Sequence, residues 1–254
     1  MSTERVVRIC GDAVARPRRP WTPTIQSFLQ HLYDCGLPVP QPLGYDERSE
    51  YVRFVEGDAG EQAWPHQLDL LGLRSVGVLL RQVHEASKGW RAPAEAEWSV
   101  PPAPSGVICH GDPQPANFAW REGRVVGLFD WDAARPAAAI SDVAYALLWF
   151  TPINADDDEI RRRGFSATPD RQARAEALLE AYGWDQPLDI LQASLNRYVQ
   201  AIDEVVLLGD RGYEPHAHWV RDGWPDRWRA GIPSLADIEL TSPYADPPAS
   251  RQPG

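Results

Sequence analysis

Proline stands at 24 of the 254 positions of the chain, about twice the average usage. Because proline fixes φ and has no backbone N–H, so many prolines divide a chain into short elements joined by stiff loops. This disfavours a long helical bundle and a repeat built only of strands. Hydrophobic residues make up 43% of the chain and charged residues 24%, which is typical of a globular protein with one large or two modest domains.

The charge balance and the lack of long apolar segments exclude several function classes. The net charge is −11, whereas general nucleic-acid binding relies on clustered basic charge. No apolar run approaches the roughly 20 residues that cross a bilayer, and residues 1–10 lack the apolar stretch of a secretory signal. Three widely spaced cysteines indicate neither a disulfide framework nor a zinc site. We therefore expect a cytoplasmic protein that binds neither nucleic acid nor membrane.

The first part of the chain has the pattern of a small β-rich unit with one helix. Residues 5–15 alternate around a Gly-Asp pair, which predicts two short strands joined by a tight turn. A helix is predicted next, with Thr22 as its N-cap and Pro23 at its first position. After a proline-rich extended stretch, residues 51–55 predict a further strand, and residues 57–60 are the candidate interdomain hinge.

The rest of the chain has a mostly helical pattern. Apolar spacing predicts helices over residues 68–86, 141–149, 170–182 and 188–208. The Glu122-Gly123 turn predicts a hairpin that continues into a strand over residues 125–129. A small β-rich piece followed by a larger helical one predicts an α+β fold of two lobes. We predict an N-terminal lobe over residues 1–57, a C-terminal lobe over residues 58–240 and a flexible tail over residues 241–254.

One loop carries the residue types that phosphoryl transfer requires. The loop HGDPQPAN, residues 110–117, places Asp112 five residues before Asn117, and Asp130 ends a strand 18 residues after Asp112. Side chains at the ends of adjacent strands can converge on one point. Phosphoryl transfer uses one carboxylate to accept the proton of the attacking hydroxyl, and hard oxygen ligands for Mg²⁺.

Two other interpretations of this loop remain open at the level of sequence. A His and an Asp two residues apart often make an ordinary structural hydrogen bond within a loop. A metal hydrolase could use His110, Asp112 and Asp130, although no second histidine stands at metal-ligand spacing from these residues.

The H-G-D-x-x-x-x-N loop followed by F-D-W-D resembles the catalytic loop and metal-binding Asp of the aminoglycoside phosphotransferase and choline kinase-like family, relatives of the protein kinases. The similarity continues in the AARPAAAISDVAYA run after the metal Asp, and it covers nearly the whole chain. It implies a two-lobed protein kinase-like fold, with a small, reduced β-rich N-terminal lobe and a larger, mostly helical C-terminal lobe.

The resemblance also implies an activity and residue roles. The activity is Mg²⁺-dependent transfer of the γ-phosphate of ATP or GTP to a hydroxyl group of a small molecule. Asp112 is implied as the catalytic base and His110 as the residue that orients the loop. Asn117 and Asp130 are implied as Mg²⁺ ligands, and Asp142 as a structural residue that bonds backbone near the catalytic loop.

The nucleotide side departs from the family pattern. The chain has no glycine-rich phosphate loop, Arg16 stands where the family has a strand Lys, and the following helix offers Gln26 in place of a Glu. Arg16 is still the candidate for phosphate contact, although arginine and lysine differ in geometry. Adenine is expected against the backbone of Phe54, Val55 and Glu56. These departures keep open an alternative, a nucleotide-binding or regulatory pseudoenzyme of the same fold with weak or no kinase activity.

The acceptor side has only weak signals. Asp132 and Glu204 are candidate substrate contacts. For Asp132, a solvated surface position is an equally good explanation. The acidic run 156–159 is a solvated helix start or part of an acidic mouth for a cationic substrate. Three late tryptophans stack on a ligand or pack in the core: Trp219, Trp224 and Trp228. We expect a small hydroxylated acceptor that could carry positive charge, and a monomer or homodimer.

Overall fold

The computed structural model describes residues 7–241 of the chain. Its N-terminal part is a four-stranded antiparallel sheet in the order β1-β2-β4-β3. The strands are β1 (Arg8–Cys10), β2 (Ala13–Pro17), β3 (Pro42–Tyr45) and β4 (Ser49–Arg53). The predicted hairpin is confirmed over the described residues, with Gly11 at φ +63° in its turn. The strand predicted at residues 51–55 starts two residues earlier, and the proline-rich stretch before it contains β3.

Helix α1 (Thr22–Asp34) covers this sheet. Its apolar residues at helical spacing are buried, which confirms the predicted amphipathic helix: Ile25, Phe28, Leu29 and Leu32. The predicted N-cap is wrong, because Trp21 is the cap and Thr22 is the first helical residue. The Thr22 hydroxyl instead accepts a hydrogen bond from the backbone N–H of Arg19, at 2.9 Å, so it fixes the turn before the helix.

The segment predicted as a hinge is hydrogen-bonded to a strand that lies 62 residues further along the chain. Asp58 forms an isolated β-bridge with Trp120, with both N–H···O distances at 2.8 Å. Gly57 lies so close that an added Cβ would come within 2.8 Å of the Trp120 carbonyl oxygen. A short 3-10 helix, η1 (Gly60–Leu68), follows and leads into the long helix α2 (Leu70–Ser87).

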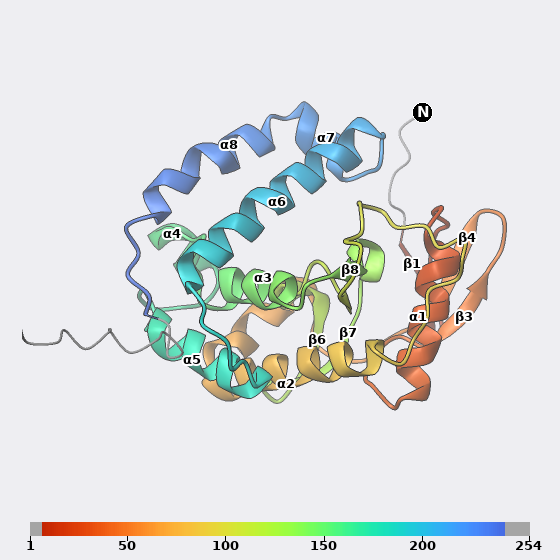
Figure 1. Cartoon of the computed structure of the whole chain (residues 1–254), viewed down its shortest axis with the longest axis horizontal. Helices are drawn as coiled ribbons and strands as arrows, with labels where there is room; N and C mark the ends of the chain where they lie inside the picture. Colours follow the sequence, from red (N-terminus) through yellow and green to blue (C-terminus); the bar gives the residue numbers. More distant parts are fainter. Residues whose placement is uncertain (1–6, 242–254) are drawn as a thin grey trace, which may run out of the picture.

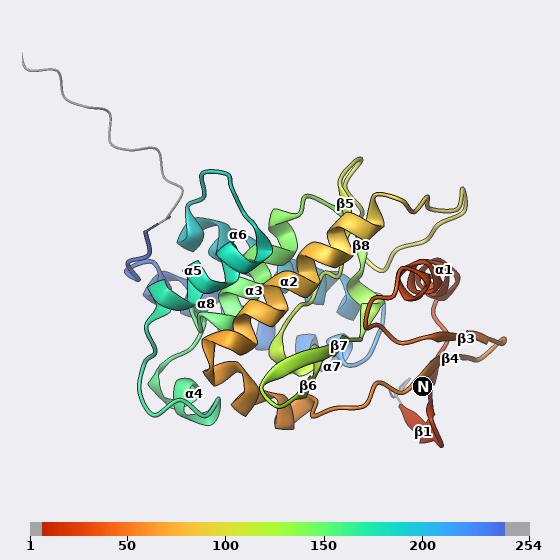
Figure 2. The same cartoon turned by 90° about the horizontal axis from the view of Figure 1, so that it is seen from below.

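The larger part of the molecule contains the remaining elements (Figure 1). Two small antiparallel sheets pair β5 (Val107–Cys109) with β8 (Arg135–Ala137), and β6 (Phe118–Arg121) with β7 (Arg124–Leu128). Helices α3 (Ile140–Phe150), α5 (Arg171–Tyr182) and α6 (Ile190–Asp210) form the predicted helical body. Figure 2 shows α2 crossing the molecule beside α5. Their close packing depends on Gly77, where an added Cβ would come within 2.6 Å of the Leu178 carbonyl oxygen.

Three short helices complete the chain. Helix α4 (Asp157–Arg162) begins after Asp156, whose carboxylate accepts from the backbone N–H of Glu159 at 2.8 Å. The acidic run is therefore a helix start. Helices α7 (His216–Arg221) and α8 (Trp224–Gly231) lie after the last predicted helix, in a region for which the sequence predicted no element. Over residues 7–241, no helix combines the length and apolar character needed to cross a membrane.

Candidate active site

The predicted catalytic loop joins β5 to β6, and its own side chains hold it in shape. The amide nitrogen of Asn117 donates to the Asp112 backbone carbonyl and to its carboxylate, both at 2.8 Å. Gln114 donates to the same carboxylate at 3.0 Å and 3.2 Å. The backbone N–H of Phe129 donates to the Asn117 carbonyl at 3.0 Å. The structure thus brings Asp130 together with Asp112 and Asn117 of the loop, and all three line one cavity.

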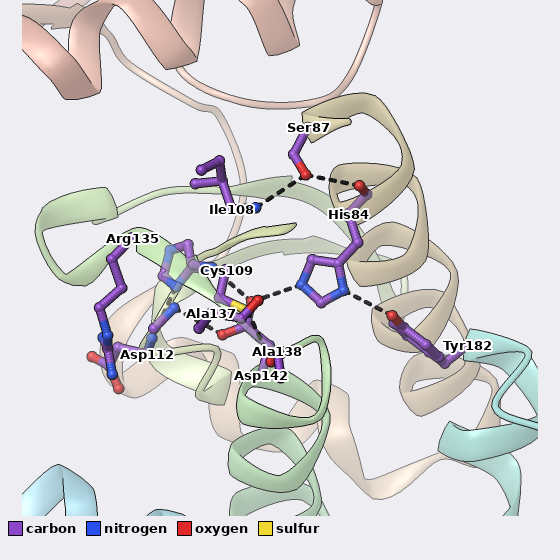
Figure 3. A network of polar contacts seen from close by, with 12 residues as sticks. His84, Ser87, Ile108, Cys109, Asp112, Arg135, Ala137, Ala138, Asp142 and Tyr182 are labelled. Carbon is purple, nitrogen blue, oxygen red and sulfur yellow. Dashed lines mark hydrogen bonds and ion pairs between the residues drawn. The ribbon is translucent and has the colours of Figure 1, made fainter. Parts of the chain in front are cut away.

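Asp142, at the start of α3, fixes the backbone of the loop from behind. Its fully buried carboxylate accepts from the backbone N–H groups of His110, at 2.6 Å, and Gly111, at 2.8 Å. It also contacts His84 Nε2 of α2 at 3.1 Å, while His84 Nδ1 lies 2.8 Å from the Tyr182 hydroxyl of α5 (Figure 3). The predicted structural role of Asp142 is confirmed.

The ionisation of Asp142 depends on these donors. Burial alone would raise the pKa of its carboxyl, but the bond and charge of His84, the nearby His110 and the Gly111 N–H lower that pKa to about 2. The carboxylate is therefore ionised at neutral pH in a buried place. It links α2 and α3 to the catalytic loop, and the His84–Tyr182 contact extends this link to α5.

His110 makes its polar contacts with backbone. Its Nε2 lies 2.9 Å from the Phe129 carbonyl oxygen, and the Asp112 N–H donates to its Nδ1 at 3.2 Å. These contacts fit an imidazole that carries its proton on Nε2. The ring packs edge-on against Trp131, with centroids 4.7 Å apart. Both nitrogens are thus used for positioning, which argues against the metal hydrolase interpretation.

Asp130 lies at the end of β7 in an unusual backbone conformation, with φ +65°. Its Oδ1 lies 3.0 Å from Nη1 of Arg16, which comes from β2. The second terminal nitrogen of Arg16, Nη2, contacts Glu50 at 2.6 Å and Asp132 at 3.6 Å. Asp132 also accepts from the Trp21 indole at 3.4 Å. Arg16 is therefore surrounded by three carboxylates, one from β4 and two from the segment that follows β7.

Glu50 is a site residue that the sequence analysis missed. It stands directly opposite Arg16 in the β2–β4 register and is only 2% exposed. Burial raises the pKa of its carboxyl even though Arg16 acts in the opposite direction. The alternation of β4 carries a signal for it, since Glu50 shares a buried face with Val52. In the family that the sequence resembles, the strand cation pairs with a Glu of the following helix. Here Arg16 pairs with Glu50 of the neighbouring strand β4.

This pairing makes a stability prediction. Arg16→Gln should lower the free energy of unfolding by about 3 kcal/mol, because it leaves the Glu50 carboxylate buried without its partner. The double variant Arg16→Gln/Glu50→Gln should recover much of the loss, since the Glu50 position then carries no unpaired buried charge. Urea unfolding of the single and double variants measures both effects. Arg53→Gln is the matched control, because its Asp12 partner is exposed and its loss should cost under about 1 kcal/mol. Equal losses for Arg16→Gln and Arg53→Gln would contradict the argument.

Two cavities meet at Asp130. An apolar slot of about 410 Å³ lies between the N-terminal sheet and Trp131, and both Arg16 and Asp130 line it. A second cavity of about 450 Å³ lies between the catalytic loop and helices α6, α7 and α8. Asp112, Asn117 and Asp130 line that second cavity together. A group placed at Asp130 would therefore reach both chambers.

The predicted adenine contacts are only partly brought together. Phe54 and Val55 line the apolar slot, but the Phe54 N–H already donates to the Asp12 carbonyl at 2.7 Å. Glu56 does not line that slot; its side chain is 84% exposed and lies 3.6 Å from Arg121. The structure thus separates Glu56 from the other two residues, because the chain turns toward Trp120 directly after it.

Glu204 lines the second cavity from α6, but it is engaged in ion pairs. Its carboxylate pairs with Arg135, and with Arg197 at 3.1 Å. Arg197 also donates to the Gly111 carbonyl at 2.6 Å. The two arginines were not among the predicted site residues, and no local motif marks them. They connect α6 to the catalytic loop and to the segment after Asp130.

The oxygen donors of the site fit a magnesium ion. Since the amide nitrogen of Asn117 bonds Asp112, its side-chain oxygen is the atom left for a cation, and Asp130 supplies a carboxylate in the same cavity. Such hard oxygen ligands suit Mg²⁺. Within residues 7–241, another group with ligand atoms close enough for a metal is His84, Cys109 and Asp142. We interpret it as structural, because His84 and Asp142 bond each other and the catalytic loop.

The fold and the site together define a kinase-like phosphotransferase. The chain belongs to the phosphotransferase enzyme family, whose model matches residues 3–98 and 89–178. This membership confirms the predicted family and the prediction of a phosphotransferase with an alcohol group as acceptor. The trifolitoxin immunity protein of Rhizobium leguminosarum bv. trifolii is 32% identical over an alignment of 188 residues that covers 68% of this chain and 68% of its own.

Solved structures of similar fold confirm the predicted two-lobed architecture. A choline/ethanolamine kinase family protein from Mesorhizobium loti superposes with a TM-score of 0.56 at 14% identity, over 91% of this chain and 85% of its own. The GDP and kanamycin complex of APH(2")-IIia gives a TM-score of 0.59 at 12% identity, over 89% of this chain and 86% of its own. At these identities the similarity shows the fold alone.

Proposed function

We propose that this protein transfers the γ-phosphate of ATP or GTP to a hydroxyl group of a small organic acceptor. The observation that carries the proposal is the meeting of the two cavities at Asp130, with Asp112 and Asn117 in the acceptor chamber. The nucleotide base would enter the apolar slot, and its phosphates would run past Arg16 toward Asp130. A structural neighbour described with GDP and kanamycin bound supports a nucleotide donor.

Asp112 would act directly on the acceptor. As the acceptor oxygen forms its bond to the γ-phosphorus, the bond from that phosphorus to the bridging oxygen breaks and a nucleoside diphosphate leaves. The hydroxyl proton passes to the Asp112 carboxylate. Gln114 and Asn117 hold this carboxylate in place. Burial raises the pKa of Asp112 despite the opposing effects of His110 and of these hydrogen bonds, which favours proton uptake.

Asn117 and Asp130 would hold Mg²⁺, which when bound neutralises phosphate charge. Asp130 would then hold the cation in place of Arg16, and Arg16 would be available to contact the phosphates. Residues 1–57 would then form the lobe that holds the nucleotide. His110 and Asp142 act through the backbone of the loop and do not touch the reacting atoms.

One observation favours a second candidate function, a nucleotide-binding or regulatory protein with weak or no transfer activity. Arg16 pairs with Asp130 at 3.0 Å, and the residue opposite Arg16 is Glu50 on a strand. Mg²⁺ must compete with this internal cation. An immunity protein among the relatives is compatible with either function, since protection can follow from modifying a compound or from binding it.

Calorimetric titration with ATP and with GTP tests the proposal. Mg²⁺ should strengthen binding of at least one nucleotide by about tenfold or more, and Asp130→Asn should remove most of that gain. A screen of hydroxylated amines, sugars and antibiotics for acceptance of labelled phosphate then identifies the acceptor. Binding without transfer to any of these compounds would favour the second function. Absence of nucleotide binding would contradict both functions.

A further inference from the structure

The second cavity, which would hold the acceptor, is polar near Asp112 and becomes mostly apolar away from it. We call it the acceptor cavity. Its wall on α3 and α6–α8 is built of aromatic and aliphatic side chains: Tyr145, Trp149, Tyr198, Ile202, Trp219 and Trp228. Trp219 and Trp228 meet edge to face, with centroids 6.0 Å apart. A volume of about 450 Å³ is within the range of sites for ligands of drug size. Such a wall stabilises a ligand through apolar contact and ring stacking.

The charges around this wall do not favour a cation. Among the described residues that line the cavity, Glu204 is the only carboxylate besides Asp112 and Asp130. Two arginines already neutralise Glu204. Asp203, the neighbouring acidic residue on α6, pairs outside the cavity with Arg229 at 2.7 Å. Acidic residues therefore do not supply uncompensated negative charge to the distal part of the cavity.

The aromatic faces are also partly occupied by internal cations. The guanidinium of Arg197 lies 4.7 Å from the ring centroid of Tyr145, and that of Arg163 lies 4.7 Å from the ring centroid of Trp149. A ligand ammonium group would compete with these arginines for the same ring faces. An uncharged flat group can instead pack against the edges and remaining faces without meeting like charge.

We propose that the acceptor of this enzyme is an uncharged hydroxyl-bearing molecule with an aromatic or other flat apolar group. The apolar group packs between Trp219, Trp228 and Tyr198, and the hydroxyl faces Asp112. This inference rests on the proposed function, because it uses the hydroxyl chemistry of Asp112 to orient the ligand. It narrows the sequence-based expectation of a small hydroxylated acceptor that could carry positive charge.

A pair of probes that differ in one charged group tests the proposal. The neutral probe is 4-nitrophenyl β-D-glucopyranoside, and the charged probe is 4-(trimethylammonio)phenyl β-D-glucopyranoside, whose cation lies on the ring that would pack against the aromatic wall. Calorimetry with the full chain should show the neutral probe binding about tenfold more tightly. Equal affinities, tighter binding of the charged probe, or no binding of the neutral probe would each overturn the proposal.

Two variants sharpen the test. Trp219→Ala should weaken binding of the neutral probe by about tenfold, whereas Tyr33→Ala is the control and should leave it unchanged, because Tyr33 is 41% exposed on α1 and does not line the cavity. Val205→Glu adds a carboxylate to the α6 wall at a position with no basic residue one helical turn away on either side, and it should shift the preference toward the charged probe. Circular dichroism checks that each variant folds. An unchanged preference in Val205→Glu would contradict the charge argument.

Nucleotide titrations in the same preparation separate this proposal from the proposed function. Mg²⁺-dependent nucleotide binding together with a preference for the charged probe would overturn the acceptor class and leave the phosphotransferase function standing. A preference for the neutral probe without nucleotide binding would support the cavity assignment and contradict the proposed function.

Discussion

Asp112→Ala is expected to lower phosphoryl transfer by about 10²–10⁴-fold while the fold stays intact, because the variant has no carboxylate to accept the hydroxyl proton. The side chain lies on a loop whose backbone is held by Asp142, so its removal does not release that loop. Transfer of labelled γ-phosphate to the acceptor found in the screen measures the effect. The thermal midpoint and the nucleotide affinity should stay close to those of the unaltered protein.

Asp112→Asn is the matched control for shape, and it should lose transfer to a similar degree because its amide cannot take up the proton. The pH profile gives an independent check. Since burial raises the pKa of Asp112 above its usual 3.8, and the base must be deprotonated, kcat/KM should fall with decreasing pH at a value above 3.8. Full activity of either variant, or an acidic limb below that value, would contradict the assignment.

The residues of the candidate site that the sequence predicted share one local segment or a recognisable spacing. Asp112 and Asn117 occupy one loop, and Asp130 follows the β6–β7 hairpin, which returns the chain to that loop. Glu50 and Arg197 reach the site through strand register and helix packing instead. Their partners, Arg16 and Gly111, lie 34 and 86 positions away in the sequence. No local motif predicts contacts across such separations.

The fold shows the same division between local pattern and distant contact. Long amphipathic segments predicted α2, α3, α5 and α6, because burial of one face imposes a period on the sequence. Helices α7 and α8 have six and eight residues, too few for a clear period. Packing supports α7: an added Cβ at Gly209 of α6 would come within 2.6 Å of Val220. The prediction of Thr22 as the N-cap of α1 is wrong, because the Thr22 hydroxyl accepts a hydrogen bond from the Arg19 N–H, which lies before the helix.

Asp142→Ala is expected to lower the free energy of unfolding by about 3–5 kcal/mol, because it leaves three buried donors without their acceptor, each at a cost of about 1–3 kcal/mol. The donors are the backbone N–H groups of His110 and Gly111 and the ring of His84. Transfer activity should fall as well, since the catalytic loop loses its support. Urea unfolding measures the stability change, and Asp189→Ala is the control. Asp189 caps α6 at the surface, so its loss should cost only about 1 kcal/mol.

The stability difference between the unaltered protein and Asp142→Ala should also depend on pH. The pKa of Asp142 is lowered on folding, from 3.8 to about 2. A lowered carboxyl pKa stabilises the folded state at pH values above the unfolded value, and this contribution disappears as the pH falls through the folded value. The difference should therefore shrink by about 2 kcal/mol between pH 3.8 and pH 2. A difference that stays constant over this interval would show that the cost of Asp142→Ala comes from lost packing, and that the ionised carboxylate does not hold the catalytic loop.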